Sequence, residues 1–149
     1  MVIMYVYWIS NPIQVNQFVL STDETSMVLR ITNEGWSDIE IEEVIVNGRH
    51  TPRSIDLGIG YSSLHVGLDT EDEFVKFVPL DTEKIQPKLS YDMLQEQIQM
   101  LVHENYKMSE LLPTNYGIRI VNDIKIDSVT IKYKFLGFTL VRELYTIDI

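Results

Sequence analysis

Isoleucine, valine and threonine make up 42 of the 149 residues, and the chain contains no alanine. Side chains branched at Cβ lose rotamer freedom in a helix but pack well on a pleated sheet, whereas alanine is the strongest helix former. The composition therefore predicts a fold built mainly from β-strands. The length is that of one ordinary domain with a sizeable core.

Apolar and polar residues alternate in the segments that we predict as strands. Met27, Leu29 and Ile31 fall on one side of an extended chain and Arg30 on the other. This period of two is typical of a strand with one buried face. We predict two antiparallel sheets packed as a sandwich, with strands at residues 15–21, 25–32, 38–46, 59–66, 74–79, 116–121, 128–136 and 139–147.

Irregularities within and between these strands are also visible. Ile39 and Ile41 are followed by Val44 and Val46, so the buried side shifts by one residue at Glu42-Glu43. A β-bulge at this point would restore the registry. Residues that tolerate a positive φ angle predict turns between strands at Asn33-Glu34-Gly35, Asn47-Gly48 and Leu136-Gly137.

One segment has helical spacing. It runs from about Ser90, the predicted N-cap, to Glu110 and is stopped by Pro113. One stripe of this helix is apolar and comprises Tyr91, Leu94, Ile98, Leu101 and Met108. We expect the inserted helix to cover the open end of the sandwich, with a partner-binding helix as the alternative.

The first nine residues are all apolar, and no basic residue precedes Arg30. A bilayer span needs about 20 residues, and the run also lacks the basic start and the cleavage site of a signal peptide. Residues 1–12 are therefore interpreted as an apolar tail, a first strand, or the remnant of a membrane anchor. Tyr5, Tyr7 and Trp8 favour the anchor, because such aromatic residues gather at membrane interfaces. Residues 13–149 are predicted to form a single domain.

The chain is acidic, with 22 acidic and 12 basic residues and a formal net charge of −10. Residues 1–74 alone carry 12 acidic and 3 basic side chains. Nucleic acids bind through lysine and arginine that replace counterions, so we expect no nucleic-acid partner. Cysteine is absent, which excludes disulfides and thiolate chemistry.

No sequence motif points to catalysis. His50, His65 and His103 have no zinc-site spacing, and no phosphate-binding or nucleophile motif occurs. Leu57-Gly-Ile-Gly-Tyr61 has two glycines of a dinucleotide fingerprint but not the third. We therefore expect no catalytic, cofactor or metal-binding residue, and we expect that the protein is not an enzyme.

Weak ligand or cation contacts have two candidate locations. The acidic run from Asp69 to Glu73, which includes Glu71 and Asp72, could bind calcium weakly, although it lacks the pattern of an EF-hand. Trp36 and Tyr61 each lie beside a glycine, where an aromatic ring could line a shallow site. The alternative is a solvated loop for the acidic run and core-capping aromatic side chains for the other two.

Three pieces of the chain combine a turn with a strand: Ile31-Thr-Asn-Glu-Gly35, residues 39–48 ending Val-Ile-Val-Asn-Gly, and residues 129–138. These pieces resemble immunoglobulin-like β-sandwich modules in extracytoplasmic proteins of Gram-positive bacteria. The chain departs from that pattern by lacking the Cys, Trp, Cys core and by carrying a helix. The resemblance implies an immunoglobulin-like sandwich that serves as an extracytoplasmic, membrane-tethered interaction or structural module, with a protein or cell-envelope component as partner.

Two alternatives remain open at this point. The chain could be a small-ligand carrier or small enzyme with a pocket between helix and sheet, to which His103 or the acidic run contributes. It could also be a subunit of a larger viral or phage assembly. Both of these alternatives are compatible with a cytoplasmic location of the protein.

Overall fold

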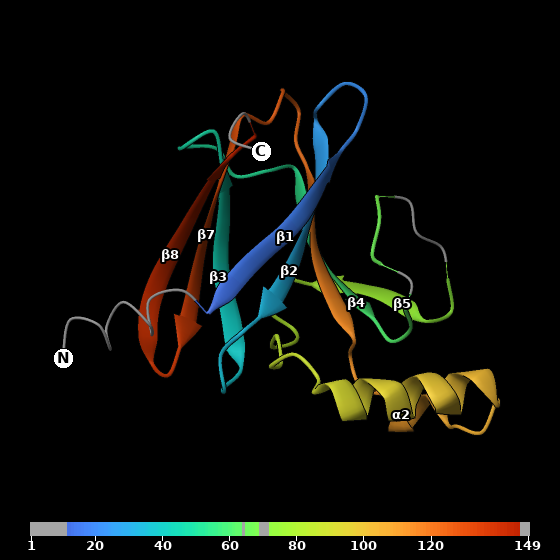
Figure 1. The fold of residues 1–149 in the computed structure, drawn as a ribbon. Helices are drawn as coiled ribbons and strands as arrows, with labels where there is room; N and C mark the ends of the chain where they lie inside the picture. Colours follow the sequence, from blue (N-terminus) through green and yellow to red (C-terminus); the bar gives the residue numbers. More distant parts are fainter. Residues whose placement is uncertain (1–11, 64, 69–71, 147–149) are drawn as a thin grey trace.

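The computed structural model describes residues 12–63, 65–68 and 72–146 of the chain. It is mainly β, with two antiparallel sheets of five and three strands. The two sheets form the layers of a sandwich, and the helix lies at one end of it (Figure 1). The prediction of a two-sheet antiparallel sandwich with one inserted helix is confirmed. Within the described residues, no helix has the length and apolar character needed to cross a membrane.

The larger sheet has the strand order β1-β2-β6-β4-β5. Hydrogen bonds between strands far apart in the chain hold its centre, since β2 and β4 both pair with β6. Its strands are β1 (Ile13–Leu20), β2 (Ser26–Asn33), β6 (Asn115–Val121), β4 (Ser54–Gly60) and β5 (Val75–Pro79).

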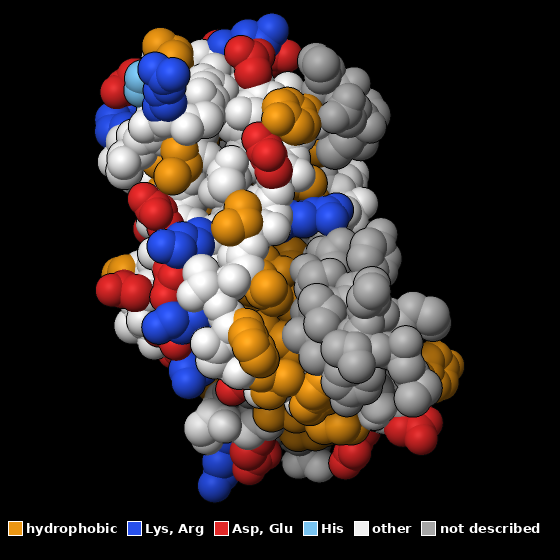
Figure 2. Space-filling model, turned by 90° about the vertical axis from the view of Figure 1, so that its left-hand side faces the viewer, with side chains coloured by type: hydrophobic (Ala, Val, Ile, Leu, Met, Phe, Trp, Pro, Cys, Tyr) orange, Lys and Arg blue, Asp and Glu red, His pale blue; other side chains and the backbone are white. Residues whose placement is uncertain are grey.

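The smaller sheet has the order β3-β7-β8, with strands β3 (Ile39–Val46), β7 (Ser128–Phe135) and β8 (Phe138–Tyr145). On its outer face, Glu42 forms ion pairs with Lys132 and Lys134, with N–O distances of 3.9 and 3.2 Å. Figure 2 looks onto the side of the molecule where this sheet lies and shows acidic and basic side chains intermixed beside a hydrophobic area. Large exposed apolar side chains of this sheet include Phe138, Val141 and Tyr145.

The hydrophobic core lies between the two sheets. The alternating residues of β2 and β7 point into it, as their pattern predicts, and Tyr133 and Phe135 are its largest fully buried side chains. Isoleucines of both sheets fill most of the rest, including Ile39, Ile118 and Ile131. Burial of these side chains is the main source of stability of such a sandwich.

Two strands carry one extra residue each. In β3, Ile41 pairs with Tyr133 and Glu43 with Lys132, so Glu42 is the extra residue of a bulge, as predicted. In β1, the register shifts in the same way between Val15 and Gln17. The β1 bulge was not predicted.

The tight turns follow the glycine signals in two of three cases. Asn47-Gly48 and Leu136-Gly137 adopt positive φ angles at both positions, between 53° and 80°. Leu136-Gly137 thus forms the two-residue hairpin turn between β7 and β8, whereas Asn47-Gly48 belongs to a three-residue turn closed by the Val46–His50 bridge. The turn after Asn33 is closed by its side chain instead, since Gly35 N–H donates to Asn33 Oδ1 at 2.8 Å.

The predicted strand at residues 59–66 is wrong in position. The strand β4 is Ser54–Gly60, and the chain after Tyr61 crosses the outer face of the larger sheet. Gly58 and Gly117 face each other across β4 and β6, and the fully buried Val66 packs over both glycines. A first side-chain carbon at Gly58 would lie 2.5 Å from Val66 Cγ1. These glycines therefore provide the space in which the crossing segment, residues 61–63 and 65–68, packs.

The helix is shorter than predicted. Helix α2 spans Tyr91–Val102, with Ser90 as its N-cap, and Met108–Glu110 forms a separate short 3-10 turn. Glu104 adopts a φ of 54°, a left-handed conformation that ends a helix. Leu94, Ile98 and Leu101 of the predicted stripe are half-buried, while Tyr91 and Met108 are exposed.

Helix α2 is fastened to the sandwich by a polar side chain. Gln97 is only 5% exposed, and its Nε2 donates to the carbonyls of Tyr61 and Leu112 at 2.9 and 2.7 Å. Its Oε1 accepts from Leu112 N–H at 2.9 Å. A buried amide with its donors and its acceptor engaged fixes both the position and the orientation of the helix.

Candidate functional site

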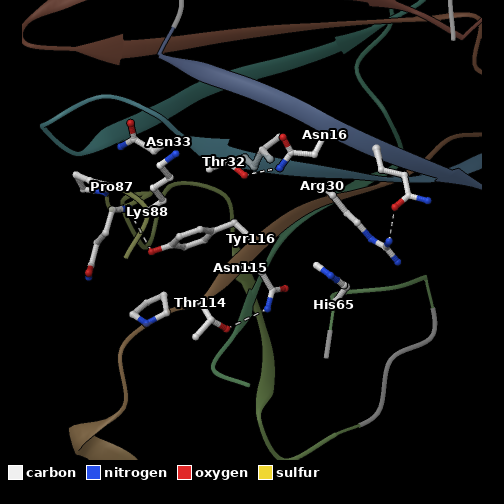
Figure 3. Close-up of a pocket in the computed structure, with 14 residues that line it drawn as sticks. Asn16, Arg30, Thr32, Asn33, His65, Pro87, Lys88, Thr114, Asn115 and Tyr116 are labelled. Carbon is white, nitrogen blue, oxygen red and sulfur yellow. Dashed lines mark hydrogen bonds between the residues drawn. The ribbon is translucent and has the colours of Figure 1, made fainter. Parts of the chain in front are cut away.

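A polar cup opens at one end of the five-stranded sheet, where two of its central strands separate. β2 and β6 pair only as far as Ile31 and Tyr116, whereas β2 continues along β1 to Asn33 and β6 continues along β4 to Asn115. The resulting fork holds a cavity of about 190 Å³ (Figure 3).

The upper wall of the cup in Figure 3 comes from β1 and β2. The bulge in β1 makes Asn16 the extra residue and turns Gln17 to the outer face. Asn16 Nδ2 donates to Thr32 Oγ1, and Arg30 Nη1 donates to Gln17 Oε1 at 2.6 Å. Bulges commonly redirect side chains beside functional sites, and this one brings a second polar side chain to the cup.

The lower wall comes from the start of β6. Asn115 Oδ1 accepts from Val66 N–H at 3.2 Å, and Asn115 Nδ2 donates to Ser62 O at 3.3 Å. Thr114 Oγ1 donates to Ser62 O at 2.6 Å. These bonds tie the segment that crosses the sheet to β6, and they place His65 at the rim of the cup.

The third wall is formed by residues 86–88, which follow the point where Ile85 pairs with the smaller sheet. Ile85 forms a two-way backbone bridge with Ile39 of the smaller sheet, and Lys88 N–H donates to Asn33 O at 3.0 Å. Gln86 N–H donates to the hydroxyl of Tyr116 at 3.1 Å. Burial raises the pKa of Tyr116 to about 12, so this hydroxyl stays protonated at neutral pH.

The charges around the cup differ from those of the chain as a whole. Arg30, His65 and Lys88 line it, and no aspartate or glutamate is among its described lining residues. Lys88 is held by Glu34 outside the cup, with an N–O distance of 2.6 Å. The cup therefore presents cationic and neutral donor groups within an acidic protein.

The candidate residues of the sequence analysis lie elsewhere. Trp36 is 59% exposed and packs edge-on against Phe135 of the smaller sheet, with ring centroids 5.5 Å apart. Tyr61 is half-buried at the end of β4, next to helix α2, with Lys76 Nζ 5.7 Å from its ring centroid. The two aromatic residues thus belong to different layers, and neither lines the cup.

The acidic run is only partly within the described residues. Asp69 and Glu71 lie outside them, whereas Asp72 and Glu73 are exposed. Asp72 Oδ1 accepts from Phe74 N–H at 2.8 Å, which closes the turn before β5. Among the described residues, no three histidine or acidic side chains are grouped closely enough to hold a metal ion.

The sequence analysis missed most of the residues that form the cup. Arg30 was identified only as outward-facing, and His65 only as lacking a zinc partner. One available signal was the spacing of Val15 and Phe18, which both pack against the core although they are three residues apart. The shift of the buried side by one residue, which located the β3 bulge, would also have located the bulge at Asn16.

Comparison of the chain with protein-family models, with curated proteins and with solved structures found no match.

Proposed function

We propose that the chain is a non-catalytic interaction module of the extracytoplasmic surface, which holds one polar group of a protein or cell-envelope partner in the cup. The observation that carries this proposal is the construction of the cup itself. Three separate segments are hydrogen-bonded into its walls, so the site exists before a partner arrives. A preformed site loses little free energy to ordering when it binds.

The size of the cup supports an interaction module rather than a carrier of a large cofactor. Pockets that enclose whole drug-sized ligands have volumes of roughly 300–1,000 Å³, and the cup has about 190 Å³. A single group projecting from a larger partner suits this volume.

The chemistry of the walls supports binding without catalysis. Thr114 and Asn115, which line the cup beside His65, are neutral hydrogen-bonding side chains without a proton to exchange near neutral pH. Such side chains form hydrogen bonds with a partner but do not transfer protons to or from it.

The extracytoplasmic, tethered location rests on the sequence. The apolar opening with Tyr5, Tyr7 and Trp8, which lies outside the described residues, supports a membrane anchor, and the resemblance to immunoglobulin-like surface modules agrees with it. The test is fractionation of cells that express the native gene. We expect the protein in the membrane fraction and open to protease added to intact cells, whereas a protease-resistant cytosolic protein would contradict this location.

Substitutions at exposed positions test the role of the cup. Asn16→Ala and His65→Ala should weaken binding of the purified protein to cell-envelope preparations, measured by co-sedimentation. His50→Ala is the matched control, because His50 is also exposed and lies away from the cup. Equal binding by all three variants and the unaltered protein would refute a role of the cup in partner binding.

A small-ligand carrier is the second candidate, and the cup is the observation that favours it. In this case the pocket lies at the β2–β6 fork and not between helix and sheet, and the exposed His103 takes no part in it. A panel of small metabolites should then raise the melting temperature at saturating concentration. The interaction module predicts no such shift with neutral metabolites, but binding to envelope preparations.

A further inference from the structure

We infer that the Arg30 end of the cup is a binding site for an oxyanion, a carboxylate or phosphate group carried by the partner. This inference rests on the proposed function and specifies the chemistry of the group that the cup receives.

Two arginines on the same face of the same sheet show why Arg30 is available. Arg119 of β6 is half-buried, forms an ion pair with Asp56 at 2.8 Å, and stacks on Phe77 at 3.7 Å from the ring centroid. Arg30 of the neighbouring strand is also half-buried, but within the described chain it forms no ion pair with a carboxylate. Arg119 is therefore neutralised within the protein, whereas no carboxylate among the described residues neutralises the charge of Arg30.

Among the described residues, few groups accept hydrogen bonds from Arg30. In the part of the chain that the structure describes, Arg30 donates one side-chain hydrogen bond, from Nη1 to the neutral amide oxygen of Gln17, and its buried Nε has no partner. A guanidinium has five N–H donors in a planar fork, which matches the oxygens of carboxylate and phosphate. Arg30 lines the cup, so an oxyanion there would serve as an acceptor for the remaining N–H groups of this fork.

Neutral groups of the cup add donors. Thr32 Oγ1 accepts from Asn16, and the Tyr116 hydroxyl accepts from Gln86 N–H, so each oxygen still has its own proton to donate. His65 adds a further N–H group at the periphery, whereas the ammonium of Lys88 is paired with Glu34 outside the cup. Because the described lining holds no carboxylate, the set favours an anion over a cation.

The acidity of the whole chain does not prevent this binding. At physiological ionic strength, charges separated by more than about 8 Å are largely screened. The affinity for a ligand in the cup therefore depends mainly on the groups that the ligand contacts. The attraction between the anion and the guanidinium of Arg30 is therefore stronger than the repulsion by carboxylates elsewhere on the protein.

The test is titration of the full chain with sodium phosphate, sodium acetate and glucose, followed by nuclear magnetic resonance. We expect phosphate or acetate to shift the Arg30 Nε–Hε and Asn16 side-chain amide signals saturably, and glucose to leave them unchanged. The two anions also distinguish the source, since a stronger effect of phosphate points to phosphate-bearing partners and a stronger effect of acetate to carboxylate-bearing ones.

Variants make the assignment specific. Arg30→Gln should weaken anion binding by about tenfold or more. Arg53→Gln is the control, because Arg53 forms an exposed ion pair with Asp123 away from the cup, and it should bind as the unaltered protein does. If Arg30→Gln does not fold, the titration of the unaltered protein tests the assignment. In that titration the anion should shift the Nε–Hε signal of Arg30 more than that of Arg53.

The outcomes separate this inference from the proposed function. The inference is overturned if neither anion gives a saturable shift, or if Arg30→Gln binds as strongly as the unaltered protein. If envelope binding still depends on Asn16 and His65 in that case, the interaction module stands and its partner presents a neutral group. Anion binding with envelope binding unaffected by the cup variants would support the oxyanion site and refute the proposed role.

Discussion

The two faces of the five-stranded sheet are built by different rules. The inner face is apolar and packs against the second sheet through residues that alternate along each strand, such as Leu29 and Ile118. The outer face combines paired glycines, a crossing segment with the buried Val66, an internally neutralised arginine and the cup.

This difference separates what stabilises the protein from what is available for binding. Alternation along one strand is enough to define the inner face, because all its side chains meet the same apolar environment. The outer face depends on contacts between segments distant in sequence, such as Asn115 with Val66. The candidate binding groups accordingly lie at its end, where strand pairing stops.

The largest expected effect is on the inner face. Ile118→Ala removes a fully buried side chain and should lower the free energy of unfolding by about 2–5 kcal/mol. Urea denaturation followed by circular dichroism measures it. Ile124→Ala is the control, because Ile124 is 54% exposed, and an equal loss there would contradict the description of the core.

The glycine pair of the outer face should have the next largest effect. Gly58→Ala places a carbon within 2.5 Å of Val66 Cγ1 and should destabilise the fold by about 1–3 kcal/mol. The same substitution combined with Val66→Ala should be less harmful than additivity predicts, because the smaller side chain relieves the clash. Additive losses in the double-mutant cycle would show that the crossing segment does not pack on Gly58.

Tyr116 connects the two faces, since its ring lies in the core and its hydroxyl reaches the cup. Its pKa is raised from 10.0 to about 12, so the unfolded chain loses this proton at lower pH than the folded chain. The stability is therefore complete below pH 10 and falls as the pH rises toward 12, by up to about 2 kcal/mol. Urea denaturation at pH 9 and pH 11 should show this fall.

Tyr116→Phe should reduce that alkaline loss. Some loss should remain, because burial also raises the pKa of Tyr133. If the variant and the unaltered protein lose stability equally between pH 9 and pH 11, Tyr116 is not the group responsible.

The smallest expected effect is on the bonds that hold the crossing segment. Asn115→Ala removes the bonds to Val66 N–H and Ser62 O and should cost about 1 kcal/mol. It should also increase amide hydrogen exchange at Val66. The exposed Asn105 provides the control, since Asn105→Ala should change stability by less than about 0.5 kcal/mol.

The sequence predicts the inner face better than the outer one for a physical reason. The alternation of β2 and β7, the β3 bulge and the Ser90 cap are local patterns, and all are confirmed. The position of β4 was wrong because Ile59 and Val66 both look like core residues, yet they are buried on opposite faces of the sheet. Likewise, nothing in the local sequence around Arg30, His65 or Lys88 indicates that the fold brings them to one cavity.

The bulge in β3 has a consequence for how the length of this strand can vary. Glu42 is the residue without an opposite partner in β7, so its deletion would leave Ile39, Ile41, Val44 and Val46 in strict alternation toward the core. Removing Ile45 instead would bring Val44 and Val46 next to each other and turn one of them away from the core, toward the outer face of the sheet. Deletion of Glu42 would thus leave the core side chains of β3 buried, whereas a deletion three positions away would turn one of them outward. We therefore expect a related chain with a shorter β3 to lack the residue at Glu42.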